Sequence, residues 1–286
     1  MAFNWPGFFT RLGSAIVFSL IMMVGLLWNE WAFLVLISLI TTLCIREFFG
    51  ICTHIFHDVI LPKYLLFGTI IFAWILLWIP FCLAHLDGLP INIAQQKYLP
   101  ALLIGFPMII LSSILSNKAG LRGCFIAICA LIYIGFPALM LIAMRLQSLL
   151  IPLALILLIW MNDTMAYLVG SFIGKTPFSK ISPKKTWEGT VGGAVLTLIL
   201  AVIWGWKSGL FDIVDWIVLA VCASVAGTAG DLLESKLKRL ALIKDSGKIM
   251  PGHGGALDRF DSLLIATPFA FAYAWLFMEA LPISVF

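Results

Sequence analysis

Long apolar runs divide most of this chain into segments of similar length. Each run extends for about 15–20 residues without strict polar–apolar alternation, which is typical of membrane-spanning helices and not of barrel strands. We therefore predict an all-α, polytopic integral membrane protein with about nine transmembrane helices. The predicted spans are 12–28, 31–45, 64–84, 100–116, 124–143, 149–169, 190–206, 217–230 and 262–281.

The composition supports this prediction. Apolar residues make up 62% of the 286 residues and charged residues only 11%. An ordinary soluble protein has about 45–50% and about 25% of these two classes. A soluble core of this length does not need so much apolar surface, so the chain is expected to reside in the lipid bilayer.

The basic residues predict how the helices are oriented. With the N-terminus in the cytoplasm, 15 of the 18 Lys and Arg fall in cytoplasmic loops, and only Lys97, Arg145 and Lys207 lie on the other side. This asymmetry follows the positive-inside rule. We therefore expect a multi-pass protein of the inner (cytoplasmic) membrane with a cytoplasmic N-terminus, an uncleaved first helix and a cytoplasmic active site. No basic stripe with interleaved aromatic residues is present, so no nucleic-acid partner is expected.

Two regions of the chain differ in character. Residues 1–150 contain spans joined by short loops and no cluster of chemically active side chains, so they are predicted to form the scaffold and the path for lipid. Residues 151–286 carry two charged loops, 170–190 and 231–261, and are predicted to be the catalytic region. Neither an internal repeat nor a linker separates the regions, which favours one integrated domain.

The segment 235–261 concentrates charge in an otherwise apolar protein. It holds six basic residues and three Asp around a Gly-His-Gly-Gly turn at 252–255. A charge at the centre of a membrane helix costs roughly 3 kcal/mol or more, so this many charges near a bilayer suggest a function. Backbone N–H groups of such a turn, placed before a helix, can bind phosphate. The alternative is a simple loop that connects two helices.

Carboxylates near this segment suggest a site for a divalent cation. Asp258 and Asp261 are three residues apart and would point the same way on a helix. Together with Asp231 they could bind one or two Mg²⁺ ions, which prefer carboxylate oxygens and substrate phosphates. Asp163 interrupts an apolar run and is expected to be buried, either as a functional residue or as a partner of a helix end near Lys184 or Lys185.

The helix around Asp231 is predicted to have one polar face. The spacing i, i+3, i+4 and i+7 places four polar side chains on that face: Asp231, Glu234, Ser235 and Lys238. For Glu234, a solvated turn beyond the membrane is the alternative. Five cations near these carboxylates are candidates to bind phosphate and to stabilise a leaving pyrophosphate: Lys184, Lys185, Lys238, Arg239 and Lys244.

Taken together, these motifs resemble the phosphatidate cytidylyltransferase (CDP-diacylglycerol synthase) family. The shared signature consists of Ser235, Leu237, Lys238, Arg239, Lys244, Asp245, Gly247, Pro251, Gly252, His253, Gly254, Gly255, Asp258, Arg259 and Asp261. The stretches 182–189, 163–167 and 230–232 are also similar. Met250 and Ala256 depart from the usual larger aliphatic residues, which affects packing more than chemistry.

The resemblance implies a reaction of CTP with phosphatidate that gives CDP-diacylglycerol and pyrophosphate with Mg²⁺, and it leaves room for a second, monovalent ion and for a homodimer. It implies that Asp231, Asp258 and Asp261 bind the metal, that Lys238 and Arg239 act with them in catalysis, and that Asp163 and Asp245 support them. The residues implied to bind the phosphates of the substrates are Lys184, Lys185, Ser235, Lys244, His253, Gly254, Gly255 and Arg259.

Two other functions fit parts of the pattern. A CTP-dependent lipid or polyprenol kinase would use similar phosphate chemistry but would need a group that activates a hydroxyl. An ion-coupled transporter could use Asp163 and Asp231 as an ion path, but it would not explain why cations and glycines cluster in two loops.

Overall fold

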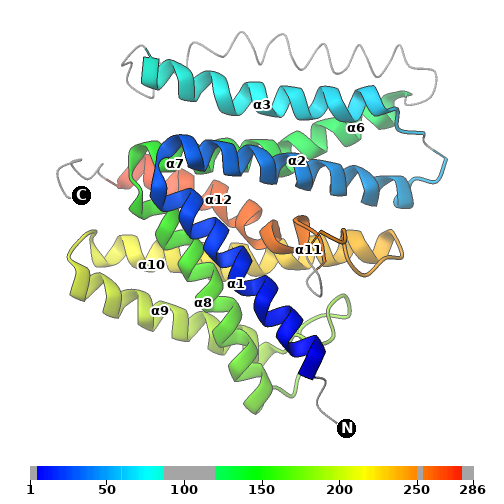
Figure 1. Ribbon diagram of the computed structural model, residues 1–286. Helices are drawn as coiled ribbons and strands as arrows, with labels where there is room; N and C mark the ends of the chain where they lie inside the picture. Colours follow the sequence, from blue (N-terminus) through cyan, green and yellow to red (C-terminus); the bar gives the residue numbers. More distant parts are fainter. Residues whose placement is uncertain (1–4, 59, 87–119, 250–253, 279–286) are drawn as a thin grey trace. The chain divides into compact units, whose positions relative to one another are not determined.

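The computed structural model describes residues 5–58, 60–86, 120–249 and 254–278, and these ranges are helical apart from short loops and one isolated bridge (Figure 1). The helices are α1 (Trp5–Trp28), α2 (Glu30–Ile55), α3 (Lys63–Leu86), α6 (Gly120–Ala130), η1 (Leu131–Gly135), α7 (Phe136–Gln147), α8 (Leu150–Ile173), α9 (Trp187–Ser208), α10 (Ile213–Val221), η2 (Cys222–Ala226), α11 (Gly227–Leu240) and α12 (Leu257–Phe277). The segments η1 and η2 are single π-helical turns inside longer helices.

The all-α membrane fold predicted from the sequence is confirmed. Among the described residues, seven helices are long and apolar enough to cross a membrane, and a shorter apolar helix covers Gly13–Trp28. The weakly predicted span 217–230 is part of a continuous 28-residue helical run, Ile213–Leu240. The predicted span 100–116 lies outside the described residues, so the count of nine stays a prediction.

The chain divides into two compact units. Unit 1 comprises Met1–Leu146 with Leu240–Arg259, and unit 2 comprises Gln147–Arg239 with Phe260–Phe286. Leu240–Arg259, which makes up most of the charged segment 235–261, therefore groups with the N-terminal helices, whereas the body of α12 groups with the C-terminal ones.

In unit 1, helix α2 packs against α1, α3 and α6 (Figure 1). Asn29 begins α2, because its side chain accepts a hydrogen bond from the Ala32 N–H at 2.7 Å and satisfies one of the free donors of the first turn. Phe33 and Leu34 are almost fully buried one turn later. A strong cap and an apolar face together fix where this central helix starts and which side it buries.

In unit 2, α8 and α9 pack closely through small residues. A Cβ atom at Gly193 would lie only 2.7 Å from backbone atoms of Ala166, and one at Gly189 would lie 2.9 Å from the Cα of Gly170. Small residues of this kind let membrane helices approach and gain van der Waals contact, which is a main source of their association in lipid. Gly189 and Gly193 thus set the separation between these two helices.

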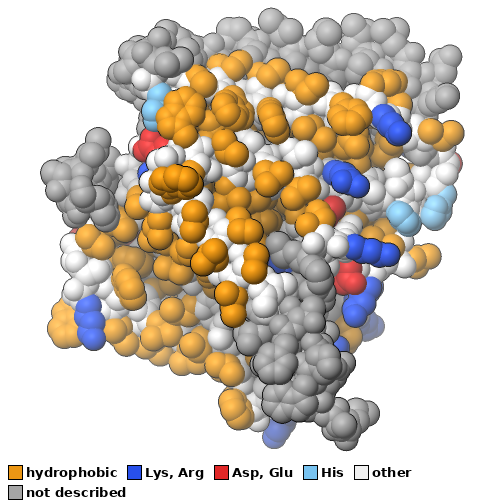
Figure 2. All heavy atoms as spheres, viewed as in Figure 1, with side chains coloured by type: hydrophobic (Ala, Val, Ile, Leu, Met, Phe, Trp, Pro, Cys, Tyr) orange, Lys and Arg blue, Asp and Glu red, His pale blue; other side chains and the backbone are white. Residues whose placement is uncertain are grey.

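Apolar side chains form broad patches on the described surface (Figure 2). On α1, for example, Ile16, Leu20 and Val24 are all about half exposed, and on α3 so are Phe67 and Ile71. A soluble monomer rarely leaves so much apolar surface in contact with water. These faces are suited to contact lipid.

The close contact between α8 and α9 predicts that Gly193→Ala destabilises the protein. The added methyl group would overlap the Ala166 backbone, and overpacking of this kind costs about 1–3 kcal/mol. Gly68→Ala on α3 is the matched control, since nothing lies within 4 Å of its added Cβ. Thermal unfolding in detergent should show a lower midpoint for Gly193→Ala only; equal midpoints for both variants would contradict the packing described.

Candidate functional site

The structure places the candidate residues in two groups, one in each unit, and each group is described by itself. Unit 2 contains Asp163, the Lys184–Lys185 pair, the polar face of α11 and Asp261. Unit 1 contains Asp258 and the loop that precedes α12.

The predicted polar face of α11 is confirmed. Lys238 forms an ion pair with Glu234 one turn before it, and the Ser235 hydroxyl lies 3.5 Å from Asp231 Oδ1. Glu234 has no exposed surface, which excludes the alternative of a solvated turn. A buried carboxylate is tolerable only with a partner, so the pair with Lys238 accounts for the presence of Glu234 here.

Helix α11 crosses α12 at Gly230. A side chain at Gly230 would overlap the carbonyl oxygen of Asp261, so the two helices touch through their backbones. Asp261 is 8% exposed, and Asp231 and Asp163 are both within electrostatic range of it, as is Lys238. Three carboxylates therefore gather within unit 2.

The prediction that Asp163 is buried is wrong, because its side chain is exposed and its neighbour Asn162 is the buried polar residue. The buried stripe of α8 includes Leu155 and Ile159 and continues to Asn162. Successive residues of an α-helix are rotated by roughly 100° about its axis, which carries Asp163 off this stripe. Asp163 nevertheless remains close enough to Asp261 to interact with it electrostatically.

Lys185 is presented to α11 by a tightly bonded loop. Its backbone carbonyl accepts from the Phe178 N–H at 2.7 Å, and its own N–H donates to the Ser182 carbonyl at 3.1 Å. Its ammonium group forms an ion pair with Asp231. The adjacent Lys184 is exposed.

The base of the same loop is closed by Glu188 in the first turn of α9. Its carboxylate accepts the Lys175 N–H at 3.1 Å and also the N–H and hydroxyl of Thr176. Thr186 caps α9 by accepting the Gly189 N–H at 3.1 Å. These bonds order the backbone on both sides of Lys185, and the ion pair with Asp231 places its ammonium group.

In unit 1, three contacts hold one oxygen of Asp258. Its Oδ2 accepts the Gly255 N–H at 2.7 Å and the Ser246 N–H at 2.9 Å, and the Ser246 hydroxyl lies 3.0 Å away. The carboxylate also lies in the first turn of α12, where a negative charge is favourable. Asp258 is thus oriented by the loop before it.

Glu47 on α2 is a residue of this group that the sequence analysis missed. Its side chain, 7% exposed, accepts the Ala256 N–H at 2.9 Å, the Leu257 N–H at 2.8 Å and the Ser246 hydroxyl at 2.7 Å. The region 1–150 was expected to contain no chemically active cluster. In the sequence, the one feature that indicates a role for Glu47 is its position next to Phe48 and Phe49 at the end of an apolar run.

The glycines of the loop are required by these two carboxylates. Side chains at Gly247 or Gly255 would overlap the carboxylate of Glu47, and one at Gly254 would overlap that of Asp258. Gly254 also has φ of +82°, which other residues rarely adopt.

The N–H of Gly255 donates to Asp258, and the next two donors point to Glu47. In this structure they are therefore not the open phosphate donors that the sequence suggested. The predicted phosphate-binding residue His253 lies outside the described residues. Four further candidate side chains are exposed: Arg239 in unit 2, and Lys244, Asp245 and Arg259 in unit 1.

The donor set suits a hard divalent cation, although the described residues form no complete cage for one. Among the described residues, no three His, Cys, Asp or Glu side chains are gathered as a finished metal site. Mg²⁺ is usually held by one or two carboxylates together with substrate phosphates and water. Asp231 and Asp261 meet that requirement in unit 2, and Asp258 is a carboxylate of the same kind in unit 1.

Comparison with known proteins finds a related family over nearly the whole chain. A model of the cytidylyltransferase family matches residues 9–277. The phosphatidate cytidylyltransferase of Bacillus subtilis (strain 168) is 46% identical over 121 residues, which cover 42% of this chain and 45% of that protein. That of Haemophilus influenzae is 41% identical over 138 residues, covering 46% and 48%. That of Staphylococcus saprophyticus is 38% identical over 171 residues, covering 58% and 65%. This chain thus spans about half to two thirds of the length of these relatives.

The contacts of Glu47 predict that Glu47→Gln loosens the attachment of Ser246, Ala256 and Leu257 to α2. The amide nitrogen of Gln would face one of the two backbone N–H donors, and leaving a buried donor unsatisfied costs about 1–3 kcal/mol. Hydrogen exchange at Ala256 and Leu257 should therefore become at least about tenfold faster. Glu30→Gln on the same helix is the control, because Glu30 is bonded to His85 and Arg145 instead. Unchanged exchange in Glu47→Gln would show that Glu47 does not hold the loop.

Proposed function

Because this chain belongs to the cytidylyltransferase family, we propose that it transfers the cytidylyl group of CTP to phosphatidate, with CDP-diacylglycerol and pyrophosphate as products. The observation that carries the proposal is the pairing of Lys185 with Asp231 and of Lys238 with Glu234 beside Asp261. Cations and carboxylates held together in a helical membrane protein match the needs of a nucleotide phosphate and a lipid phosphate. The relatives named above bear the name of this activity.

The proposed reaction needs no nucleophile from the protein. An oxygen of the phosphatidate phosphate attacks the α-phosphorus of CTP, and a new P–O bond forms. The bond between the α-phosphorus and the oxygen that bridges to the β-phosphate breaks in line with the attack, and pyrophosphate leaves with that oxygen. The protein's task is to position the two phosphates and to stabilise the charge that develops on the leaving group.

Lys185 and Lys238 are suited to that task because each already sits against a carboxylate. When a substrate phosphate arrives, it can replace Asp231 as the partner of the Lys185 ammonium group, and it can bind Lys238 beside Glu234, whose enclosed carboxylate keeps its pair. Lys238 is 12% exposed and Lys185 is 30% exposed, so both are partly desolvated and attract an anion more strongly than a lysine in water. Arg239, with Lys184, Lys244 and Arg259, supplies further positive charge at the surface.

The family resemblance makes Asp231 and Asp261 in unit 2 and Asp258 in unit 1 each a candidate ligand of Mg²⁺. The ion, when bound, neutralises phosphate charge and lowers the barrier to departure of pyrophosphate. Asp258 contributes an oriented carboxylate, since Ser246 and Gly255 fix one of its oxygens. Asp163 and Asp245 are proposed to tune the local charge. The proposal also includes a second, monovalent ion and a homodimer, and both rest on the family resemblance alone.

The reaction is proposed to take place at the cytoplasmic face of the inner membrane, where water-soluble CTP meets a bilayer lipid. The distribution of Lys and Arg supports this orientation. In unit 1, Glu47 joins the distal part of α2 to the loop before α12. The distribution of Lys and Arg predicts that both segments lie on the cytoplasmic side of the membrane.

The direct test is turnover by purified protein in detergent with phosphatidate, CTP and Mg²⁺. Release of pyrophosphate together with a CDP-lipid on chromatography supports the proposal, and both should be lost on chelation of the metal. Formation of CDP with a phosphorylated lipid alcohol would instead identify a kinase. A folded protein without nucleotide turnover would refute both enzymatic functions.

Asp258→Asn should lower kcat by about 100-fold or more, because it removes a charge placed to act on the metal and the phosphates. The variant should keep its membrane insertion and thermal stability, since Asn can still accept from Gly255 and Ser246. Asp212→Asn, an exposed position before α10, is the control and should retain full activity. Near-normal turnover in Asp258→Asn would remove Asp258 from the site.

Lys185→Ala should raise the apparent KM for CTP about tenfold, the change expected when about 1.4 kcal/mol of binding free energy is lost. Lys175→Ala, in the same loop but outside the Asp231 pair, should leave KM unchanged. Steady-state kinetics at several CTP concentrations give KM and kcat separately. A fall in kcat with constant KM would assign Lys185 to a different step.

The proposed orientation predicts opposite labelling of two engineered cysteines. In a background without native cysteines, Lys180→Cys should react with an impermeant maleimide only from the cytoplasmic side. Lys207→Cys, at the other end of α9, should react only from the opposite side. The reverse pattern would invert the topology.

A further inference from the structure

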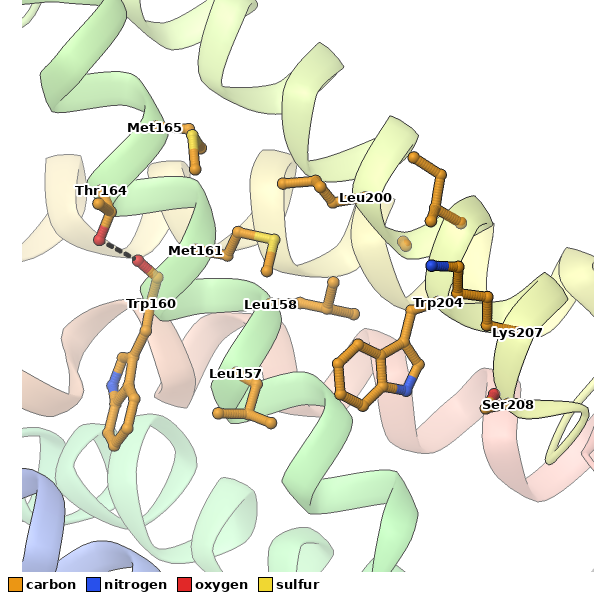
Figure 3. A pocket seen from close by; sticks show the side chains of 12 residues that line it. Leu157, Leu158, Trp160, Met161, Thr164, Met165, Leu200, Trp204, Lys207 and Ser208 are labelled. Atoms are coloured by element: carbon orange, nitrogen blue, oxygen red, sulfur yellow. Dashed lines mark hydrogen bonds between the residues drawn. The ribbon is translucent and has the colours of Figure 1, made fainter.

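Helices α8 and α9 are in close contact at Ala166 and Gly193 but leave a pocket where they separate. Its volume is about 880 Å³, and its walls include Leu157 and Met161 from α8 and Leu200 from α9 (Figure 3). The two helices diverge because the side chains of α9 become larger along its length. Residue 193 is glycine, whereas residue 200 is leucine and residue 204 is tryptophan.

The pocket suits hydrocarbon chains. Both of its helices are long and apolar enough to span a membrane, so the medium beside it is lipid rather than water. Its volume falls within the range of about 300–1,000 Å³ that is common for ligand sites. Met161 and Met165 line it, and methionine side chains adapt readily to flexible apolar ligands.

One end of the pocket is polar. Lys207 and Ser208 lie there, next to Trp204 (Figure 3). No ion pair of Lys207 is found within the part of the chain that the structure describes, and Lys207 is the only charged residue of the lining. The Ser208 hydroxyl oxygen is buried and has no hydrogen-bond partner among the described residues. A cation and an unsatisfied hydroxyl at the end of an apolar pocket together suit an anionic, hydrogen-bonding group.

We propose that this pocket is a binding site for one phospholipid, with its acyl chains between α8 and α9 and its phosphate on Lys207 and Ser208. Charge complementarity selects this occupant, because a neutral lipid or a second helix would leave Lys207 without a partner. The position of Trp204 supports it, since aromatic side chains favour the level of the lipid head groups.

This site is separate from the proposed substrate site. Lys207 and Lys185 flank opposite ends of α9, which has 22 residues and a length of about 33 Å. A phosphate at Lys207 therefore lies in the other leaflet from a phosphate at Lys185. The bound phospholipid fills the space between two membrane helices and does not enter the reaction, so the inference does not depend on the proposed function.

The test is native mass spectrometry of delipidated protein in detergent after addition of phosphatidylglycerol. Wild type should carry one bound phosphatidylglycerol at low lipid excess. Lys207→Gln should weaken this binding about tenfold, corresponding to loss of one charge-assisted contact. Lys175→Gln, the same change at the other end of the α8–α9 pair, should bind as wild type does. Diacylglycerol, which has chains but no phosphate, should bind poorly to all three proteins.

Two further variants separate the pocket from general attraction of anionic lipid. Ser208→Ala should weaken binding less than Lys207→Gln does, and Ala201→Phe should block it by filling the pocket. Equal binding by wild type and Lys207→Gln would overturn the proposal, as would equal binding of diacylglycerol. A disulfide-linked dimer of Ile203→Cys, with no lipid retained, would show that a second copy of the chain occupies this face instead. The CTP turnover of Lys207→Gln, measured separately, should remain normal.

Discussion

Burial of charge without loss of its hydrogen bonds is the constraint on which this structure depends. Glu47 illustrates it most clearly, because a carboxylate enclosed between apolar helices must receive donors from the protein itself. It takes them from the backbone at the start of α12 and from Ser246, and so ties α2 to a loop about 200 residues later in the chain. The same oxygens explain the absence of side chains at Gly247 and Gly255. Glycine at these two positions therefore leaves the space that the Glu47 carboxylate occupies.

The ion pairs in unit 2 follow the same constraint. Asp231 and Glu234 each face a lysine, and Asp261 is kept nearly out of contact with solvent where α11 and α12 touch at Gly230. Such pairs contribute little to stability once the cost of desolvation is counted. We propose that the more exposed pair also serves in exchange, in which a substrate phosphate replaces Asp231 at Lys185 and a metal ion replaces Lys185 at Asp231.

The sequence predicted well the features that depend on local periodicity. Apolar runs gave the helices, and the spacing of Asp231, Glu234, Ser235 and Lys238 gave the polar face of α11, because each of these patterns involves residues close together in the chain. Glu47 was missed because its partners lie far away in sequence, and no local pattern records such contacts. The burial of Asp163 was wrong because a difference of one position rotates a side chain to another face of the helix. The open phosphate donors were not found where expected, since the carboxylate that engages two of them comes from α2.

In the proposed reaction, the α-phosphorus of CTP is transferred to the lipid as part of a cytidylyl group. Incubation with phosphatidate and with CTP labelled with ³²P at either the α- or the γ-position tests this transfer. The α-label is expected in the lipid fraction and the γ-label in pyrophosphate. Transfer of the γ-label to lipid, with the α-label left in CDP, would contradict it.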